Sequence, residues 1–86
     1  MSRTESELWI VMIRDGQPSP AEVRLSRGSS VTWFNRDATE HVLNAAGWES
    51  GTLAPGAQIT RRFEKVGTFR YQCRLHPNEG GTITVR

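Results

Sequence analysis

The chain has 86 residues, of which 36% are hydrophobic, with eight glycines, four prolines and a net charge of +2. This length fits one compact domain, the eleven basic residues are scattered along the chain, and no apolar run approaches the roughly 20 residues of a membrane helix. These features predict a single domain, and they argue against membrane insertion and against nucleic-acid binding, which requires a concentrated basic face.

Residues 1–7 contain two acids, Glu5 and Glu7, and lack an apolar segment followed by a small-residue cleavage site. We therefore expect a flexible terminus without a secretory signal, followed by the rest of a single domain over residues 1–86. A chain of this kind is cytosolic, or a leader has been removed from it.

Short β-rich runs separated by turn signals follow one another along the chain. The turn signals include Asp15-Gly16, the Gly- and Pro-containing segment 47–56, and the segment 77–81. No segment has a sustained helical period. The pattern predicts an all-β sandwich of about seven to eight strands, and the runs are 8–14, 21–26, 30–35, 41–45, 58–63, 68–73 and 82–85.

Alternation along the strand at 68–73 predicts which of its side chains face the core. Phe69, Tyr71 and Cys73 share one face, and polar side chains alternate with them, so Cys73 points inward at the end of a core strand. The strand at 58–63 breaks this rule, because Arg61 has the same parity as its apolar neighbours; a bulge or an edge position would explain it.

The chemistry is concentrated in Cys73, His76 and His41. Cys73 is the single cysteine, His76 follows it by three residues, and His41 is the other histidine of the chain. A thiolate with two imidazoles is the ligand set of a trigonal copper site, which a weak axial partner completes. The C-x-x-H spacing alone is weak evidence, and a cysteine, histidines and a carboxylate also suit tetrahedral zinc.

The sequence resembles the plastocyanin, amicyanin and pseudoazurin group of cupredoxins. The similarity covers residues 31–85, through the blocks VTWFNRD, GWESGTLAPG, FEKVGTFRYQC and CRLHPNEGGTITV. The resemblance implies a Greek-key sandwich that binds one copper ion per chain, with His41, Cys73 and His76 as metal ligands. It also implies a monomer in the periplasm or another extracytoplasmic compartment, which is not an enzyme and meets its redox partner proteins transiently.

Glu79 is the main departure from that group, since it stands where many relatives have an axial methionine. Met1 and Met12 lie elsewhere in the chain. A carboxylate is a harder donor than a thioether, so it would favour Cu(II) over Cu(I). The alternatives are a solvated Glu79 and an axial oxygen from the Asn78 carbonyl; the backbone carbonyl of Glu40 could approach from the opposite side.

The leading functional hypothesis is a mononuclear copper protein that carries single electrons through a site made of two histidines, one cysteine and Glu79. One alternative is a copper-handling or copper-sensing protein in which electron transfer is secondary. Another is a copper site that reacts with a small molecule. Fast electron exchange between the oxidised and reduced protein would favour the carrier.

Overall fold

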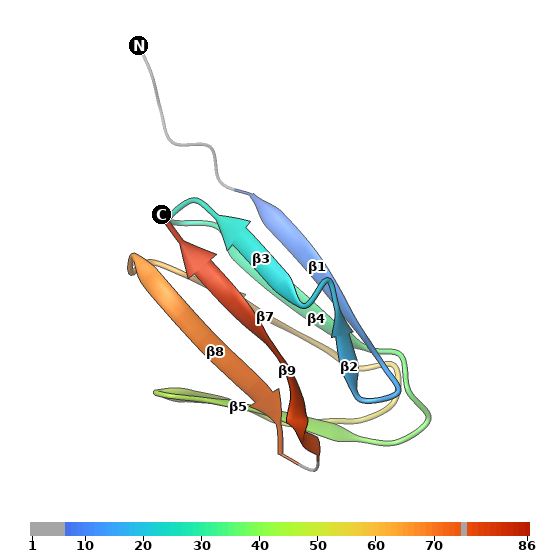
Figure 1. Ribbon diagram of the computed structural model, residues 1–86. Coiled ribbons are helices and arrows are strands. Elements are labelled where there is room, and N and C mark those ends of the chain that lie inside the picture. Colours follow the sequence, from blue (N-terminus) through green and yellow to red (C-terminus); the bar gives the residue numbers. More distant parts are fainter. Residues whose placement is uncertain (1–6, 75) are drawn as a thin grey trace.

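The computed structural model describes residues 7–74 and 76–86, and for residues 76–79 it describes the backbone without the side chains. The described residues form nine strands in two facing sheets (Figure 1). One sheet has the order β2-β1-β4-β7, and the other has the order β3-β9-β8-β5-β6. The strands are β1 (Leu8–Arg14), β2 (Gln17–Ser19), β3 (Glu22–Leu25), β4 (Ser30–Asn35), β5 (His41–Ala45), β6 (Trp48–Leu53), β7 (Gln58–Arg62), β8 (Gly67–Cys73) and β9 (His76–Val85).

The predicted all-β sandwich is confirmed, and the structure adds two strands to the seven predicted runs. Strand β2 directly follows the Asp15-Gly16 turn, and β6 occupies part of the segment 47–56 that the sequence pattern predicts as a connection. The last strand also begins earlier than predicted, at His76 and not at Thr82. The described residues include no helix long and apolar enough to cross a membrane.

The core lies between the two sheets and is built by strands that alternate buried and exposed residues. Strand β8 follows this rule as predicted, because Tyr71 and Cys73 are buried while Arg70 and Gln72 are exposed. Removing these apolar side chains from water is the main force that holds the sheets together. The buried hydrophobic residues are Val11, Ile13, Val23, Leu25, Val31, Trp33, Leu43, Leu53, Phe63, Tyr71, Cys73, Ile83 and Val85.

The parity exception at Arg61 is explained by the edge position of its strand. Strand β7 is the last strand of its sheet, and the Arg61 guanidinium lies over the Trp48 ring, 4.9 Å from the ring centroid. Trp48 in turn packs against Trp33, with 5.5 Å between the ring centroids. A cation over an indole face is a favourable contact that keeps the charge accessible to water. The edge position of β7 and this contact therefore explain the exposed Arg61, and no bulge is needed.

Three parts of the chain lie at the same end of the sandwich and form the surroundings of the site. They are the turn between β1 and β2, the loop between β4 and β5, and the end of β8, all at the end opposite the C-terminus (Figure 1). The β1–β2 turn is a two-residue hairpin loop in which Asp15 and Gly16 have φ angles of 53° and 76°. Asp-Gly is a preferred sequence for such a turn, because both central residues need positive φ.

Candidate metal centre

Cys73 ends β8 inside the sandwich. Cys73 is 1% exposed, and its backbone pairs with that of Leu43 in the neighbouring strand β5. The next residue is also fixed, since the Arg74 amide donates to the Val42 carbonyl at 2.8 Å. The predicted inward direction of the thiol is therefore confirmed, and its position is set by the pairing of β5 with β8.

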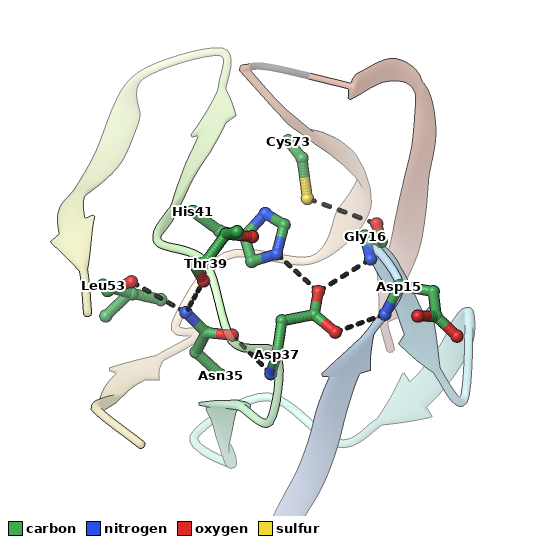
Figure 2. A network of polar contacts seen from close by, with 8 residues as sticks. All are labelled: Asp15, Gly16, Asn35, Asp37, Thr39, His41, Leu53 and Cys73. Carbon is green, nitrogen blue, oxygen red and sulfur yellow. Dashed lines mark hydrogen bonds and ion pairs between the residues drawn. The ribbon is translucent and has the colours of Figure 1, made fainter. Parts of the chain in front are cut away.

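His41 begins β5 and is as deeply buried as Cys73, with 1% of the residue exposed. Its Nε2 lies 2.6 Å from Oδ2 of Asp37. Figure 2 shows the imidazole ring between Asp37 and Cys73, with its second nitrogen on the side of the Cys73 sulfur. This second nitrogen, Nδ1, is itself buried. Two donor side chains predicted for the site are thus brought together at the end of the sandwich.

The loop that leads into His41 is held by the buried side chain of Asn35. Its Nδ2 donates to the carbonyls of Thr39 at 2.9 Å and Leu53 at 2.8 Å, and its Oδ1 accepts from the Asp37 amide at 2.9 Å (Figure 2). Buried polar groups are costly unless they are paired, and each of these bonds also fixes a loop position. Asn35 therefore sets the path of residues 36–40 and with it the position of Asp37.

Asp37 joins this loop to the turn between β1 and β2. Its carboxylate accepts hydrogen bonds from the amides of Asp15 and Gly16, the latter at 2.8 Å, in addition to its contact with His41. Burial by itself would raise the pKa of the Asp37 carboxyl group, but the bonds from Gly16, Asp15 and His41 outweigh this and lower the pKa below its ordinary value. The side chain is therefore an anion at neutral pH, although only 12% of it is exposed.

Gly16 links the same turn to the cysteine. The Cys73 thiol donates to the Gly16 carbonyl oxygen, with a sulfur-to-oxygen distance of 3.5 Å. Because the amide of Gly16 donates to Asp37, this one residue contacts both a partner of His41 and Cys73 itself. The turn thus reaches both candidate ligands.

The backbone of His76 lies next to Cys73, since the first residue of β9 pairs with Cys73 across a register shift. The side chains of His76, Asn78 and Glu79 lie outside the described part of the structure, so their roles as ligands remain predictions. Among the side chains that are described, no three His, Cys, Asp or Glu residues form a group able to hold a metal ion.

The described donors fit a copper ion. A buried thiol that can ionise and a buried imidazole nitrogen on the same side provide a soft and an intermediate ligand, which is the combination that copper sites with thiolate use. Burial of both residues keeps water away from them. The backbone of His76, the second predicted imidazole ligand, pairs with that of Cys73.

Asp37 and Gly16 are site residues that sequence reasoning missed. Asp37 stands at the end of the block VTWFNRD without an assigned role, and Gly16 was recognised only as part of a turn. The available signal for Asp37 was its position four residues before a candidate histidine ligand, and for Gly16 it was the hairpin preference of Asp-Gly. Neither signal predicts that the two would meet, because their contact depends on the parallel pairing of β1 with β4.

Comparison with known proteins supports the architecture. No protein-family model matches the chain. Amicyanin from Paracoccus denitrificans is 30% identical over 71 residues, and amicyanin-alpha from Methylorubrum extorquens is 32% identical over 71 residues. Each match covers 74% of this chain, but the chain spans only 54% and 60% of the lengths of these two relatives.

Solved structures agree over most of the chain. A purple cupredoxin from Nitrosopumilus maritimus superposes with a TM-score of 0.83 at 26% identity, covering 91% of this chain and 99% of that one. A Cu(I) structure of an amicyanin variant gives a TM-score of 0.86 at 24% identity, covering 92% and 82%. The chain has two facing sheets, and Cys73 and His76 occupy paired positions in one of them. From these features and the similarity to the solved structures, we conclude that the chain has the cupredoxin fold.

Proposed function

We propose that this chain binds one copper ion through His41, Cys73 and His76, with Glu79 as the axial ligand, and carries single electrons between redox proteins. The observation that carries the proposal is a buried thiol, next to the backbone of His76, with a buried imidazole on the same side, in a cupredoxin fold. The bound ion would supply a one-electron couple between Cu(II) and Cu(I), reduced by a donor protein and oxidised by an acceptor protein.

The chain's own residues would hold this site nearly unchanged between the two redox states. Cys73 is fixed by strand pairing, and His41 is fixed by Asp37 and by the loop that Asn35 holds. Donors that cannot move far keep the reorganisation on electron transfer small. This rigidity supports a carrier, which exchanges electrons without bond making, over an enzyme.

The partners belong to the same proposal. A monomer that docks briefly on its donor and acceptor needs only a small contact, and weak redox encounters bury less than about 1,200 Å² in total. The extracytoplasmic location implied by the resemblance to cupredoxins is also part of the proposal, and cell fractionation with an antibody against the chain would test it.

The test of the copper site is a titration with Cu(II) followed by visible absorption. We expect one copper per chain and a sulfur-to-copper band, because Cys73 is the single cysteine and only it can supply a thiolate. Cys73→Ala should abolish the band while circular dichroism shows an intact sandwich. Val23→Ala, a core change in another strand, is the matched control and should keep the band. A band that persists in Cys73→Ala would rule out the site.

A further inference from the structure

The Asp37 carboxylate contacts three nitrogen atoms on two separate segments. The Asp15 and Gly16 amides come from the β1–β2 turn, and the His41 Nε2 comes from the start of β5 (Figure 2). The amides are fixed backbone donors in a hairpin turn, so they hold the carboxylate in place whether or not the imidazole is present. Asp37 is thus a rigid acceptor toward which the His41 ring must orient.

An ionised carboxylate can only accept hydrogen bonds. The 2.6 Å contact between Asp37 Oδ2 and His41 Nε2 therefore requires the hydrogen to be on Nε2. In a neutral imidazole the other nitrogen then carries the lone pair, and a metal needs such an unprotonated nitrogen. For His41 that nitrogen is Nδ1, which lies on the Cys73 side of the ring (Figure 2).

The second link runs through Gly16. Its amide donates to Asp37 at 2.8 Å, and its carbonyl accepts from the Cys73 thiol at 3.5 Å. Together with the contact between Asp37 and His41, these bonds form a continuous path from the thiol to the imidazole. The path crosses from one sheet to the other, because Gly16 follows β1 while Cys73 and His41 belong to β8 and β5.

We propose that Asp37 is a positioning residue that holds His41 as the Nε2–H tautomer with Nδ1 directed at the Cys73 side, and that the β1–β2 turn thereby sets both candidate ligands. The part of this inference that concerns metal binding rests on the proposed copper site. The part that concerns the tautomer does not, because it describes the metal-free protein.

The position of Asp37 also has an electronic consequence. A carboxylate on the far nitrogen makes an imidazole a stronger donor, and partners of this kind typically change metal affinity by about 10- to 100-fold. The added negative charge stabilises Cu(II) more than Cu(I). Asp37 should therefore strengthen the binding of the oxidised ion and lower the reduction potential of the site.

The first test uses nitrogen-15 NMR of the metal-free wild-type protein at neutral pH. Long-range proton–nitrogen spectra distinguish a protonated from an unprotonated ring nitrogen. We expect His41 to show a protonated Nε2 and an unprotonated Nδ1. Observation of the Nδ1–H tautomer, or of a mixture of the two in rapid exchange, would overturn the proposal without any variant having to fold.

The second test compares Asp37→Asn with Asp15→Asn. Both changes remove one negative charge from the same part of the molecule, but only the first removes the carboxylate that contacts His41, since Asp15 contributes its amide. Asparagine also tolerates the positive φ of residue 15. In Asp37→Asn we expect a loss of the single His41 tautomer and a 10- to 100-fold weaker binding of Cu(II), measured by competition with a chelator.

The reduction potential distinguishes the proposed role of Asp37 from a merely structural one, which would leave the potential unchanged. A tenfold loss of preference for Cu(II) over Cu(I) corresponds to about 59 mV for a one-electron couple. The potential should rise by at least this amount in Asp37→Asn and by much less in Asp15→Asn. Equal effects of the two variants on affinity and potential would show a general charge effect and overturn the inference.

These outcomes separate the two proposals. A wild-type chain with the expected tautomer that fails to bind copper contradicts the proposed function and leaves the positioning of His41 by Asp37 intact. A chain that binds copper with a visible thiolate band but shows the other His41 tautomer in its metal-free form contradicts the role of Asp37 alone.

Discussion

At the scale of single residues, the predicted axial ligand Glu79 can be tested by replacing its side chain. If its carboxylate is the axial ligand, the anionic oxygen stabilises Cu(II) more than Cu(I), so Glu79→Met should raise the reduction potential. We expect a rise above about 59 mV, which is a tenfold change in relative affinity for a one-electron couple. The visible spectrum should shift at the same time, because a weaker axial donor allows a stronger copper–thiolate bond. Voltammetry and absorption of the loaded variants measure both effects.

Two further variants control this prediction. Glu79→Gln removes the charge with little change in size, and it should raise the potential in the same direction. Glu64→Gln removes an equal charge at an exposed position where Glu64 pairs with Arg62 at 2.8 Å, and it should have little effect. If both Glu79 variants behave like Glu64→Gln, then Glu79 is a solvated residue and does not bind the metal.

The positions of the two candidate ligands Cys73 and His41 could be predicted from sequence to different degrees. The inward direction of Cys73 followed from the alternation of apolar and polar residues along 68–73, because strand periodicity is a local property. The burial of His41 and its contact with Asp37 could not be read in the same way. They depend on the Asn35 side chain, which holds the loop, and on a turn about 20 residues earlier in the chain.

At the scale of elements, strand β9 has no room for a side chain at Gly80. Gly80 of β9 pairs with Gln72 of β8, one step before the register shift that places His76 beside Cys73. A Cβ at Gly80 would lie 2.8 Å from the Gln72 Cα and would also collide with the Tyr71 carbonyl oxygen. Since both are backbone atoms, the strands themselves would have to separate.

Gly80→Ala should therefore destabilise the protein by about 1–3 kcal/mol, the usual range for overpacking, and should also disturb the copper site. Urea denaturation measures the first effect and the visible band of the loaded protein the second. Gly47→Ala is the control, because no atom lies within 4 Å of its added Cβ and its cost is confined to the φ angle of 90°. Gly47→Ala should lose stability but keep the band. An unchanged band in Gly80→Ala would show that the register of β8 and β9 does not set the site.

The elements that sequence reasoning missed have physical explanations. Strand β2 has only three residues and contains Pro18, so it offers almost no alternation, although the preceding Asp-Gly turn is a strong hairpin signal. Strand β6 contains Gly51 and is mostly polar, as expected for a strand at the edge of its sheet. The longer strands β1 and β8 were placed within one residue of their ends, because each is an uninterrupted β-rich run of seven residues.

At the scale of the whole molecule, the two sheets are joined by an aromatic group around Trp33. Trp33 is fully buried and contacts the rings of Trp48, Phe63 and Tyr71, with centroid distances of 5.5, 6.4 and 5.3 Å. Because Trp33 lies in β4 and Tyr71 in β8, their contact crosses the sandwich. The inward direction of Tyr71 followed from the sequence pattern, whereas its contact with Trp33 required the sheet order.

Ionisation of Tyr71 should lower the free energy of unfolding at alkaline pH. Burial raises the pKa of the Tyr71 phenol from 10.0 to about 12, since the core disfavours the phenolate. Between these two values the unfolded chain releases the phenolic proton while the folded chain retains it. Stability is therefore fully present below pH 10 and falls as the pH rises toward 12, by at most about 1.4 kcal/mol per pH unit from this group.

Urea denaturation of the metal-free protein at several pH values measures this loss, and absorbance near 295 nm follows ionisation directly because Tyr71 is the single tyrosine. Tyr71→Phe is the matched control: it keeps the ring against Trp33 and removes the ionisable group. The difference in unfolding free energy between wild type and variant should be nearly constant below pH 10 and should then change in favour of Tyr71→Phe. Other ionisable groups are common to both proteins, so their contributions cancel in the difference. A constant difference up to pH 12, or a folded protein that ionises at pH 10, would show that the phenol is reached by water.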